Sequence, residues 1–230
     1  MNSLNSGRAV YPAEEFTSEQ SSTLCFTGHR SGGIRTYRGI QTYRSITVAA
    51  VRLMLSRYID LAAESGYTTF ISGLAEGIDL WAAEYVLKMR MTNPDIRLIG
   101  AMPYLRHAER FSASGRRLLE QVEEQADCLI TVNTDPDSVY SRSGASEMKN
   151  LYRDRNYFMV ESSSAVIAFL DENKPYSGTM QTVSYAYRRG RKVFRFGSDD
   201  IFDVIDEAGT DIRSIGAEIL QAVPSLSDIP

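Results

Sequence analysis

The run YTTFISGLAEGID at residues 67–79 contains the pattern that decides the fold. Its first six residues are rich in β-branched and aromatic side chains, the composition of a strand. Two glycines then flank the expected start of a helix. A strand that turns directly into a helix is the repeating unit of parallel α/β sheets. The run therefore predicts a strand, a glycine-rich turn and a helix, in that order.

The same alternation extends from about residue 23 to residue 196. Apolar residues recur at helical spacing between the strands, as at Val51, Met54, Leu55, Tyr58 and Ala62. Most strands are apolar throughout, as expected of strands covered on both faces. The pattern predicts an α/β fold, a Rossmann-like three-layer sandwich with a mainly parallel sheet of about six strands. The strands are expected at residues 23–27, 67–72, 96–101, 127–132, 164–170 and 192–196.

One domain accounts for the 230 residues. Residues 1–21 are polar without sustained periodicity and are expected to form a flexible amino-terminal arm. Residues 22–198 are expected to form the Rossmann-like domain. Residues 199–230 are expected to form a helical extension, in which Ile212 and Ile219 share one helix face.

Composition excludes several classes of function. The net charge of −4 argues against a protein that mainly coats nucleic acid. Cys25 and Cys128 lie in apolar strand-like runs and are expected to be buried reduced thiols, too few for a disulfide framework or a zinc site. No apolar stretch approaches the ~20 residues of a membrane span, and the first residues lack the features of a signal peptide. We therefore expect a cytoplasmic protein without a metal site or membrane contact, and homo-oligomerisation is left open.

The turns that follow the strands are the candidate sites, because open parallel sheets bind ligands beyond the carboxyl ends of their strands. After the first strand, Gly28 permits close backbone approach, and Arg30 can grip a phosphate or carboxylate; the alternative is a plain loop with an exposed arginine. After the second, Gly73 and Gly77 match neither the dinucleotide-binding nor the P-loop spacing. Free N–H groups at the helix start would still favour an anion there, unless the turn is purely structural. Asp79 either caps the helix or contacts the ligand.

Two further turns complete the candidate site. Tyr104 follows the third strand and would lie beside a base, or else pack within its loop. Residues 174–179, KPYSGT, offer another phosphate cradle at a helix start, or a simple N-cap by Thr179. Arg155 and Asn156 are placed to reach the same rim. His107 has no visible acidic or nucleophilic partner and is expected to lie on the surface.

Five segments in chain order resemble the YpsA-like branch of the SLOG superfamily: TGHR (27–30), SGLAEGIDLWAAE (72–84), MPY (102–104), RNYFMVE (155–161) and SGT (177–179). The resemblance covers about residues 22–197. It implies a Rossmann-like sheet that senses or processes a nucleotide-derived ligand, with no established reaction and no certain cofactor. Ser177 stands where the branch usually has glycine, and Glu161 where aspartate is usual. The divergent segment 32–45 also bears on ligand identity more than on fold.

Turn chemistry and resemblance together give one set of expected ligand-binding residues, while catalytic residues are not assigned. The set is Gly28, His29, Arg30, Ser72, Gly73, Leu74, Ala75, Gly77, Asp79, Pro103, Tyr104, Arg155, Asn156, Ser177, Gly178 and Thr179.

Two relatives of this branch supply alternative functions. Residues 72–79 also resemble DprA, which binds single-stranded DNA and a recombinase. A strip that would serve such binding contains Arg35, Tyr37, Arg38, Tyr43 and Arg44, although the acidic net charge favours a solvated loop.

The second alternative is a nucleotide N-glycosidic hydrolase like the cytokinin-activating phosphoribohydrolases. Their Pro-Gly-Gly-x-Gly-Thr-x-x-Glu signature, anchored on residues 178–179, places Thr182 at the catalytic glutamate. That activity is therefore predicted to be absent, unless Asp79, Glu147 or Glu161 replaces the missing carboxylate.

Overall fold

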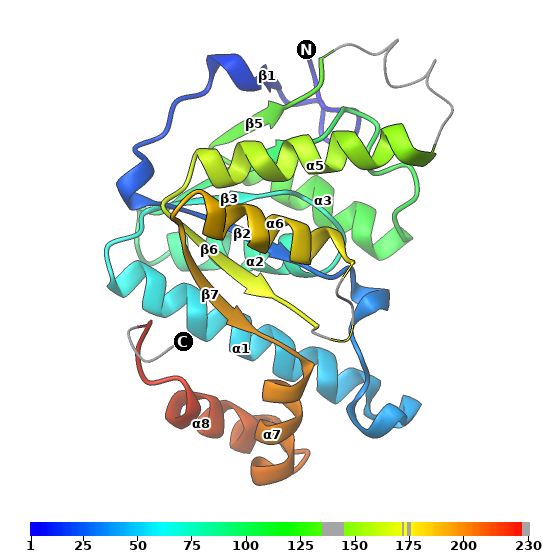
Figure 1. Cartoon of the computed structure of the whole chain (residues 1–230), viewed down its shortest axis with the longest axis vertical. Helices are drawn as coiled ribbons and strands as arrows, with labels where there is room; N and C mark the ends of the chain where they lie inside the picture. Colours follow the sequence, from blue (N-terminus) through cyan, green and yellow to red (C-terminus); the bar gives the residue numbers. More distant parts are fainter. Residues whose placement is uncertain (135–144, 172, 174–175, 227–230) are drawn as a thin grey trace.

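The computed structural model describes residues 1–134, 145–171, 173 and 176–226, and their arrangement is the predicted α/β sandwich (Figure 1). Seven parallel strands form one sheet in the order β1-β5-β4-β3-β2-β6-β7. The strands are β1 (Tyr11–Pro12), β2 (Thr23–Gly28), β3 (Thr69–Ser72), β4 (Arg97–Met102), β5 (Cys128–Thr131), β6 (Ala165–Phe169) and β7 (Lys192–Phe196).

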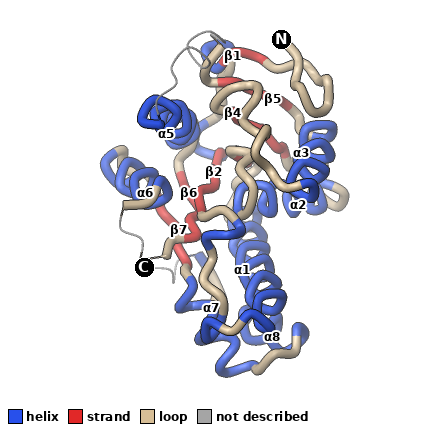
Figure 2. Tube along the Cα trace, turned by 90° about the vertical axis from the view of Figure 1, so that its right-hand side faces the viewer, coloured by secondary structure: helices blue, strands red, loops and turns tan. Residues whose placement is uncertain are grey.

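Helices cover both faces of the sheet. Figure 2 shows α5 and α6 on one side of the strands and α1, α2 and α3 on the other, while α7 and α8 pack along α1 beyond the sheet. The α-helices are α1 (Arg44–Glu64), α2 (Ile78–Arg90), α3 (Ala113–Gln125), α5 (Ala145–Glu161), α6 (Gly178–Arg188), α7 (Ser198–Ala208) and α8 (Ile212–Ala222). Short 3-10 turns lie at Ala13–Glu15, Gln20–Ser22, Ser31–Gly33, Tyr37–Gly39 and Gln41–Tyr43.

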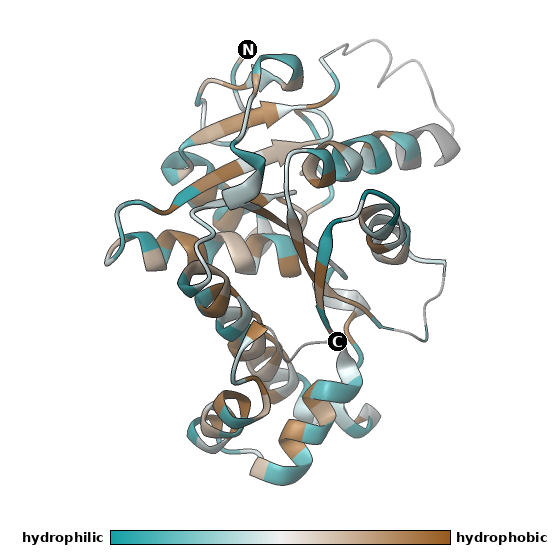
Figure 3. Ribbon diagram, turned by 60° about the vertical axis from the view of Figure 1, so that its left-hand side comes forward, coloured by the Kyte–Doolittle hydropathy of each residue, from teal (hydrophilic) through white to brown (hydrophobic). Residues whose placement is uncertain are grey.

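The apolar strands divide the interior into two cores. Successive side chains of a strand point to opposite faces, so Leu24 and Phe26 pack in the core under α1 and α2, whereas Cys25 packs under α5 and α6. Figure 3 shows the strands at the sheet centre as continuous hydrophobic ribbons between helices of mixed hydropathy. Coverage on both faces explains why the strands lack polar alternation.

The six predicted strands are confirmed to within two residues at each end, and the seventh is β1. The segment expected to be a flexible arm instead extends the sheet by pairing with β5. Val10 is buried, and the Arg8 guanidinium donates 2.7 Å to the carbonyl of Glu124. A two-residue strand carries no periodicity, so nothing in the sequence pattern marked it.

Both cysteines are free thiols, and only Cys25 is fully buried. Burial raises the pKa of the Cys25 thiol to about 12, which keeps it protonated and unreactive. Cys128 is half-buried rather than buried as predicted. Among the helices of the described ranges, none has the length and apolarity that crossing a membrane requires.

The strand order reverses at β2. From β2 the chain builds outward through β3, β4 and β5, and it later crosses to β6 and β7 on the other side. Gly28 and Phe169, which end β2 and β6, are paired in register. The point where the strand order reverses is where open α/β sheets leave a crevice for a ligand.

Candidate functional site

Three glycine-containing turns lie at one end of the sheet. β2 ends at Gly28, β3 ends just before Gly73, and α6 begins at Gly178 after β6. Because all the strands are parallel, these turns share the carboxyl end of the sheet, near the point where the strand order reverses. The topology thus brings together three of the four turns singled out in the sequence around the reversal point.

The turn after β3 is fixed by its own side chains. The buried hydroxyl of Ser72 donates to the carbonyl of Asp79 at 2.8 Å and accepts from the amide of Leu74 at 3.1 Å. Leu74 is fully buried although its φ is +56°, a left-handed conformation that costs a non-glycine residue free energy. The amide of Ala75 donates to the Asp79 carboxylate at 3.4 Å. The turn is therefore held in one conformation.

A buried ion pair lies under this turn. The Arg155 guanidinium is 3.5 Å from the Asp79 carboxylate, and the two side chains are 5% and 7% exposed. The same guanidinium donates to the Gly73 carbonyl. A Cβ at position 73 would collide with both Arg155 and Asp79, so the ion pair explains why this position is glycine.

Burial shifts the pKa values of both side chains in the direction that favours their neutral forms. It raises the pKa of Asp79 to about 6, while the positive charge of Arg155 opposes a larger rise. Burial likewise lowers the pKa of Arg155, against the attraction of Asp79. The Asp79 carboxylate thus joins α2, α5 and the turn after β3.

Gly28 and Gly77 let α2 dock against the turn after β2. A Cβ at Gly28 would lie 2.6 Å from the Ile78 side chain, and one at Gly77 would lie 2.6 Å from the Ser31 amide nitrogen. Gly77 also has a φ of +108°, which disfavours any other residue. The start of α2 therefore faces the protein's own backbone. This agrees with the alternative given for this turn, that its role is purely structural.

The start of α6 is open by comparison. The Ser177 hydroxyl caps the helix by accepting from the Met180 amide at 3.1 Å, so the N-cap is Ser177 rather than Thr179. The amides of Gly178 and Thr179 belong to the first turn, where no intrahelical acceptor exists. Gly178 is exposed, and apart from its chain neighbours and its own helix no atom of the described residues lies within 4 Å of the position its Cβ would take. The preceding positions 174 and 175 lie outside the described residues.

Arg30 supplies an exposed cation at this end of the sheet. Its guanidinium carbon lies 5.7 Å from the ring centroid of Tyr152 on α5. The Tyr152 hydroxyl is 3.5 Å from that of Tyr104, which is buried after β4. Sequence reasoning missed Tyr152, although it lies three residues before Arg155 and so on the same helix face.

The turn after β6 contributes a second residue that sequence reasoning missed. The Asp171 carboxylate is 1% exposed, accepts from the Asn173 amide at 3.2 Å and lies 3.3 Å from the Arg35 guanidinium. The Asp171 amide donates to Nε2 of His29 at 3.1 Å, which joins the segments that follow β2 and β6. The sequence feature that could have identified Asp171 is its position directly after a strand, at the point where the strand order reverses.

Two residues that were predicted to contact the ligand contact other parts of the protein instead. Asn156 donates 2.8 Å to the hydroxyl of Thr182 and so joins α5 to α6. Pro103 is buried, and its carbonyl accepts from the Asn133 amide at 3.2 Å. Both residues therefore make contacts within the protein that hold neighbouring segments together.

His107 is buried, contrary to the surface position predicted from its lack of partners. It is 4% exposed, and its Nδ1 lies 3.2 Å from the Tyr104 carbonyl. The rings of Tyr104 and Phe111 meet it edge to face. Burial lowers the pKa of His107 to about 4, so the ring is neutral at pH 7. The aromatic neighbours and the contact of Nδ1 with a backbone carbonyl account for its place in the interior.

The strip considered for DNA binding is engaged within the protein. Arg35 and Arg38 form ion pairs, and Arg44 donates to backbone carbonyls at the start of the strip. Tyr37 is buried, and its hydroxyl donates to Asp206, the partner of Arg38. Carboxylates pair with Arg35 and Arg38, backbone carbonyls hold Arg44, and one aromatic ring is withdrawn from solvent.

These features define a Rossmann-like α/β protein with a candidate ligand site at the carboxyl end of the sheet, where the strand order reverses. The family model described as the YspA SLOG family matches residues 24–196, so the chain belongs to that family. The chain is also similar to the UPF0398 proteins of Bacillus cereus (strain ATCC 14579) and Bacillus thuringiensis (strain Al Hakam). Each is 27% identical over 165 residues, a span of 70% of this chain and 84% of the relative. The predicted membership is confirmed.

Proposed function

We propose that this protein binds a nucleotide or nucleotide-derived molecule at the carboxyl ends of β2, β3 and β6, as a sensor or processing protein. The observation that carries the proposal is the open start of α6 at the same end of the sheet as the exposed Arg30. Unpaired helix amides and the helix dipole favour a phosphate, and a guanidinium can bind it with two parallel hydrogen bonds. Membership of the SLOG family points to the same ligand class.

The fixed turn after β3 supports this function by holding one side of the proposed site in place. The Asp79–Arg155 pair anchors the Gly73 carbonyl from below, so the peptide has little freedom to move. A preorganised wall lowers the entropy lost when a ligand binds. Tyr152, beside Arg30, offers an aromatic surface for the base.

Replacing Arg30 with alanine is expected to weaken binding of a nucleoside phosphate at least about tenfold, because a charge-assisted hydrogen bond contributes ~1.5–3 kcal/mol. Calorimetric titration with a panel of nucleoside phosphates and dinucleotides measures the effect. Arg97→Ala is the matched control, since Arg97 is an exposed arginine at the amino end of β4, at the end of the sheet opposite the proposed site. Equal losses in the two variants would contradict the proposed site.

Single-stranded DNA binding is the alternative that the same titrations test. Flat responses to every nucleotide, together with tight and salt-dependent binding of single-stranded DNA, would favour it over the small-ligand proposal. The intramolecular partners of Arg35, Arg38 and Arg44 and the net charge of −4 weigh against a positive groove.

We expect no release of free base from adenosine monophosphate or an N6-modified analogue. Thr182 carries no charge, is 2% exposed, and its hydroxyl donates to the Gly178 carbonyl at 2.8 Å. Glu161 ends α5 at the opposite end of the sheet and pairs with Arg189. Asp79 is paired with Arg155, and the side chain of Glu147 lies outside the described residues.

Chromatography of the reaction mixture detects any free base. Turnover that survives Thr182→Ala but is lost in Asp79→Asn would contradict this expectation and identify the protein as an enzyme.

A further inference from the structure

A groove of about 470 Å³ lies between α1 and α2 on the side of these helices that faces away from the sheet. Ala49 and Leu53 of α1 line one side of it, and Trp81 and Tyr85 of α2 line the other. Ile212, the first residue of α8, also borders the groove and is 43% exposed. Figure 2 shows α2, α1 and α8 in succession along one side of the molecule. No function described above uses this face.

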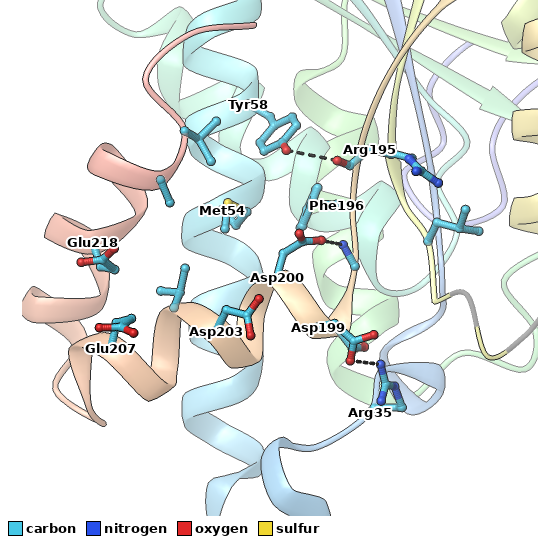
Figure 4. A pocket seen from close by; sticks show the side chains of 16 residues that line it. Arg35, Met54, Tyr58, Arg195, Phe196, Asp199, Asp200, Asp203, Glu207 and Glu218 are labelled. Atoms are coloured by element: carbon cyan, nitrogen blue, oxygen red, sulfur yellow. Dashed lines mark hydrogen bonds and ion pairs between the residues drawn. The ribbon is translucent and has the colours of Figure 1, made fainter. Parts of the chain in front are cut away.

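The helix α1 is apolar on two opposite sides. Figure 4 shows Met54 and Tyr58 on the side that faces α7 and β7. At 3.6 residues per turn, Ala49 lies about 180° around the helix from Tyr58, and Leu53 lies about 140° from it. Ala49 and Leu53 are only half-buried. Because a helix with apolar side chains all round is normally enclosed by protein, the outer side of α1 fits a surface that another chain covers.

The outer side of α2 is complementary to itself. Trp81, Glu84, Lys88 and Met91 follow one another at helical spacing, and Met91, directly after the last residue of the helix, is 85% exposed. Glu84 and Lys88 lie at equal distances before and after Val86, and so do Trp81 and Met91. If two copies of α2 pack antiparallel with their centres at Val86, each Glu84 meets a Lys88 and each Met91 comes over a Trp81.

The charges beside the groove cancel, so a second copy meets little repulsion there. Arg52 and Lys88 balance Asp60 and Glu84. Glu84 pairs with Arg52 across the two helices, and Asp60 accepts from the Tyr85 hydroxyl at 2.8 Å. The whole chain has a net charge of −4, which disfavours self-association elsewhere on an acidic surface. A neutral face with opposite charges placed about one centre is what a two-fold interface requires.

We propose that this face binds a second copy of the chain, in a two-fold dimer in which α2 packs antiparallel against α2 of the other copy. Met91 of each copy enters the groove of the other between Trp81 and Ile212, where an unbranched side chain adapts readily to the available space. The ion pair between Glu84 and Lys88 then forms twice. The proposal does not rest on the nucleotide site, and its test does not depend on nucleotide binding.

Two measurements on the full chain test the dimer and its location together. Light scattering coupled to size-exclusion chromatography should give twice the 25.7 kDa of one chain at high concentration, falling toward one chain on dilution. Trp81 is the only tryptophan of the sequence, so its fluorescence reports on the groove. Its emission should move to longer wavelength over the same dilution, because the ring becomes exposed to water as the dimer dissociates.

Charge reversal tests the antiparallel register. Glu84→Lys and Lys88→Glu should each weaken association at least about tenfold, because two-fold symmetry places like charges together twice in every dimer. Combining the two substitutions exchanges the members of each ion pair and should restore association. Glu120→Lys is the matched control, since it makes the same charge change at an exposed position on α3 and should leave the dissociation constant unchanged.

Met91→Ala changes no charge and should still weaken association severalfold, because it removes the side chain that enters the groove. Thermal unfolding confirms that each variant is folded, as expected for substitutions of solvent-accessible side chains. Three results would overturn the proposal: the mass of one chain at every concentration, a dimer whose Trp81 emission does not follow its mass, or equal effects of Glu84→Lys and Glu120→Lys.

Discussion

Replacing Arg155 with methionine is expected to lower the free energy of unfolding by about 3–5 kcal/mol at pH 8, because it leaves the buried Asp79 carboxylate without a counter-ion. The variant also loses the hydrogen bond from the guanidinium to the Gly73 carbonyl. Urea unfolding measures the change. At pH 5 the loss should be smaller, since Asp79, with a pKa of about 6 even beside Arg155, is then mostly protonated.

Arg153→Met is the matched control on the same helix. Its ion pair with Asp154 joins side chains that are 37% and 48% exposed, so its loss should change stability by less than about 1 kcal/mol. Adding Asp79→Asn to Arg155→Met should recover part of the loss, because the uncompensated charge is removed. An Arg155 effect no larger than that of Arg153 would refute the structural role given to the pair.

The strands and the turns that follow them could be predicted because their signals are local. Apolar runs bounded by glycine mark a covered parallel strand, and the glycines at 28, 73 and 178 then fall at one end of the sheet as a consequence of parallel topology. A single segment such as residues 67–79 contains every element of that inference. The strand β1 could not be predicted in this way, because a strand of two residues shows no hydrophobic pattern.

The contacts that define the site could not be predicted, since they join residues far apart in the chain. Asp79 and Arg155 lie on different helices, and only the packing of α5 over the sheet brings them together. The reason for glycine at 73 follows from that packing and not from the turn alone. The burial of His107 was missed for a different reason: its partners Tyr104 and Phe111 are close in the chain, but this segment of turns has no periodicity that shows which side chains face the interior.

His107 and Asp79 are expected to shape the pH dependence of stability with opposite signs. The pKa of His107 falls from 6.5 to about 4 on folding, mainly through burial, with the positive charge of Arg155 acting in the same direction. Between these values the unfolded chain binds a proton that the native protein does not, so stability rises with pH. The pKa of Asp79 rises from 3.8 to about 6, so over that window the native state binds more protons and stability falls as pH rises.

Replacing His107 with phenylalanine should remove the contribution of His107 to the pH dependence of stability and leave that of Asp79. The aromatic contacts with Tyr104 and Phe111 can be kept, whereas the titrating ring is lost. The free energy of unfolding of the native sequence, minus that of the variant, should rise by roughly 3 kcal/mol between pH 4 and pH 6.5, at ~1.4 kcal/mol per pH unit. Urea unfolding at half-unit steps of pH measures both curves, and the carboxylates common to the two proteins cancel in the difference. Parallel curves would show that His107 titrates alike in the folded and unfolded chains, and hence that water reaches its ring.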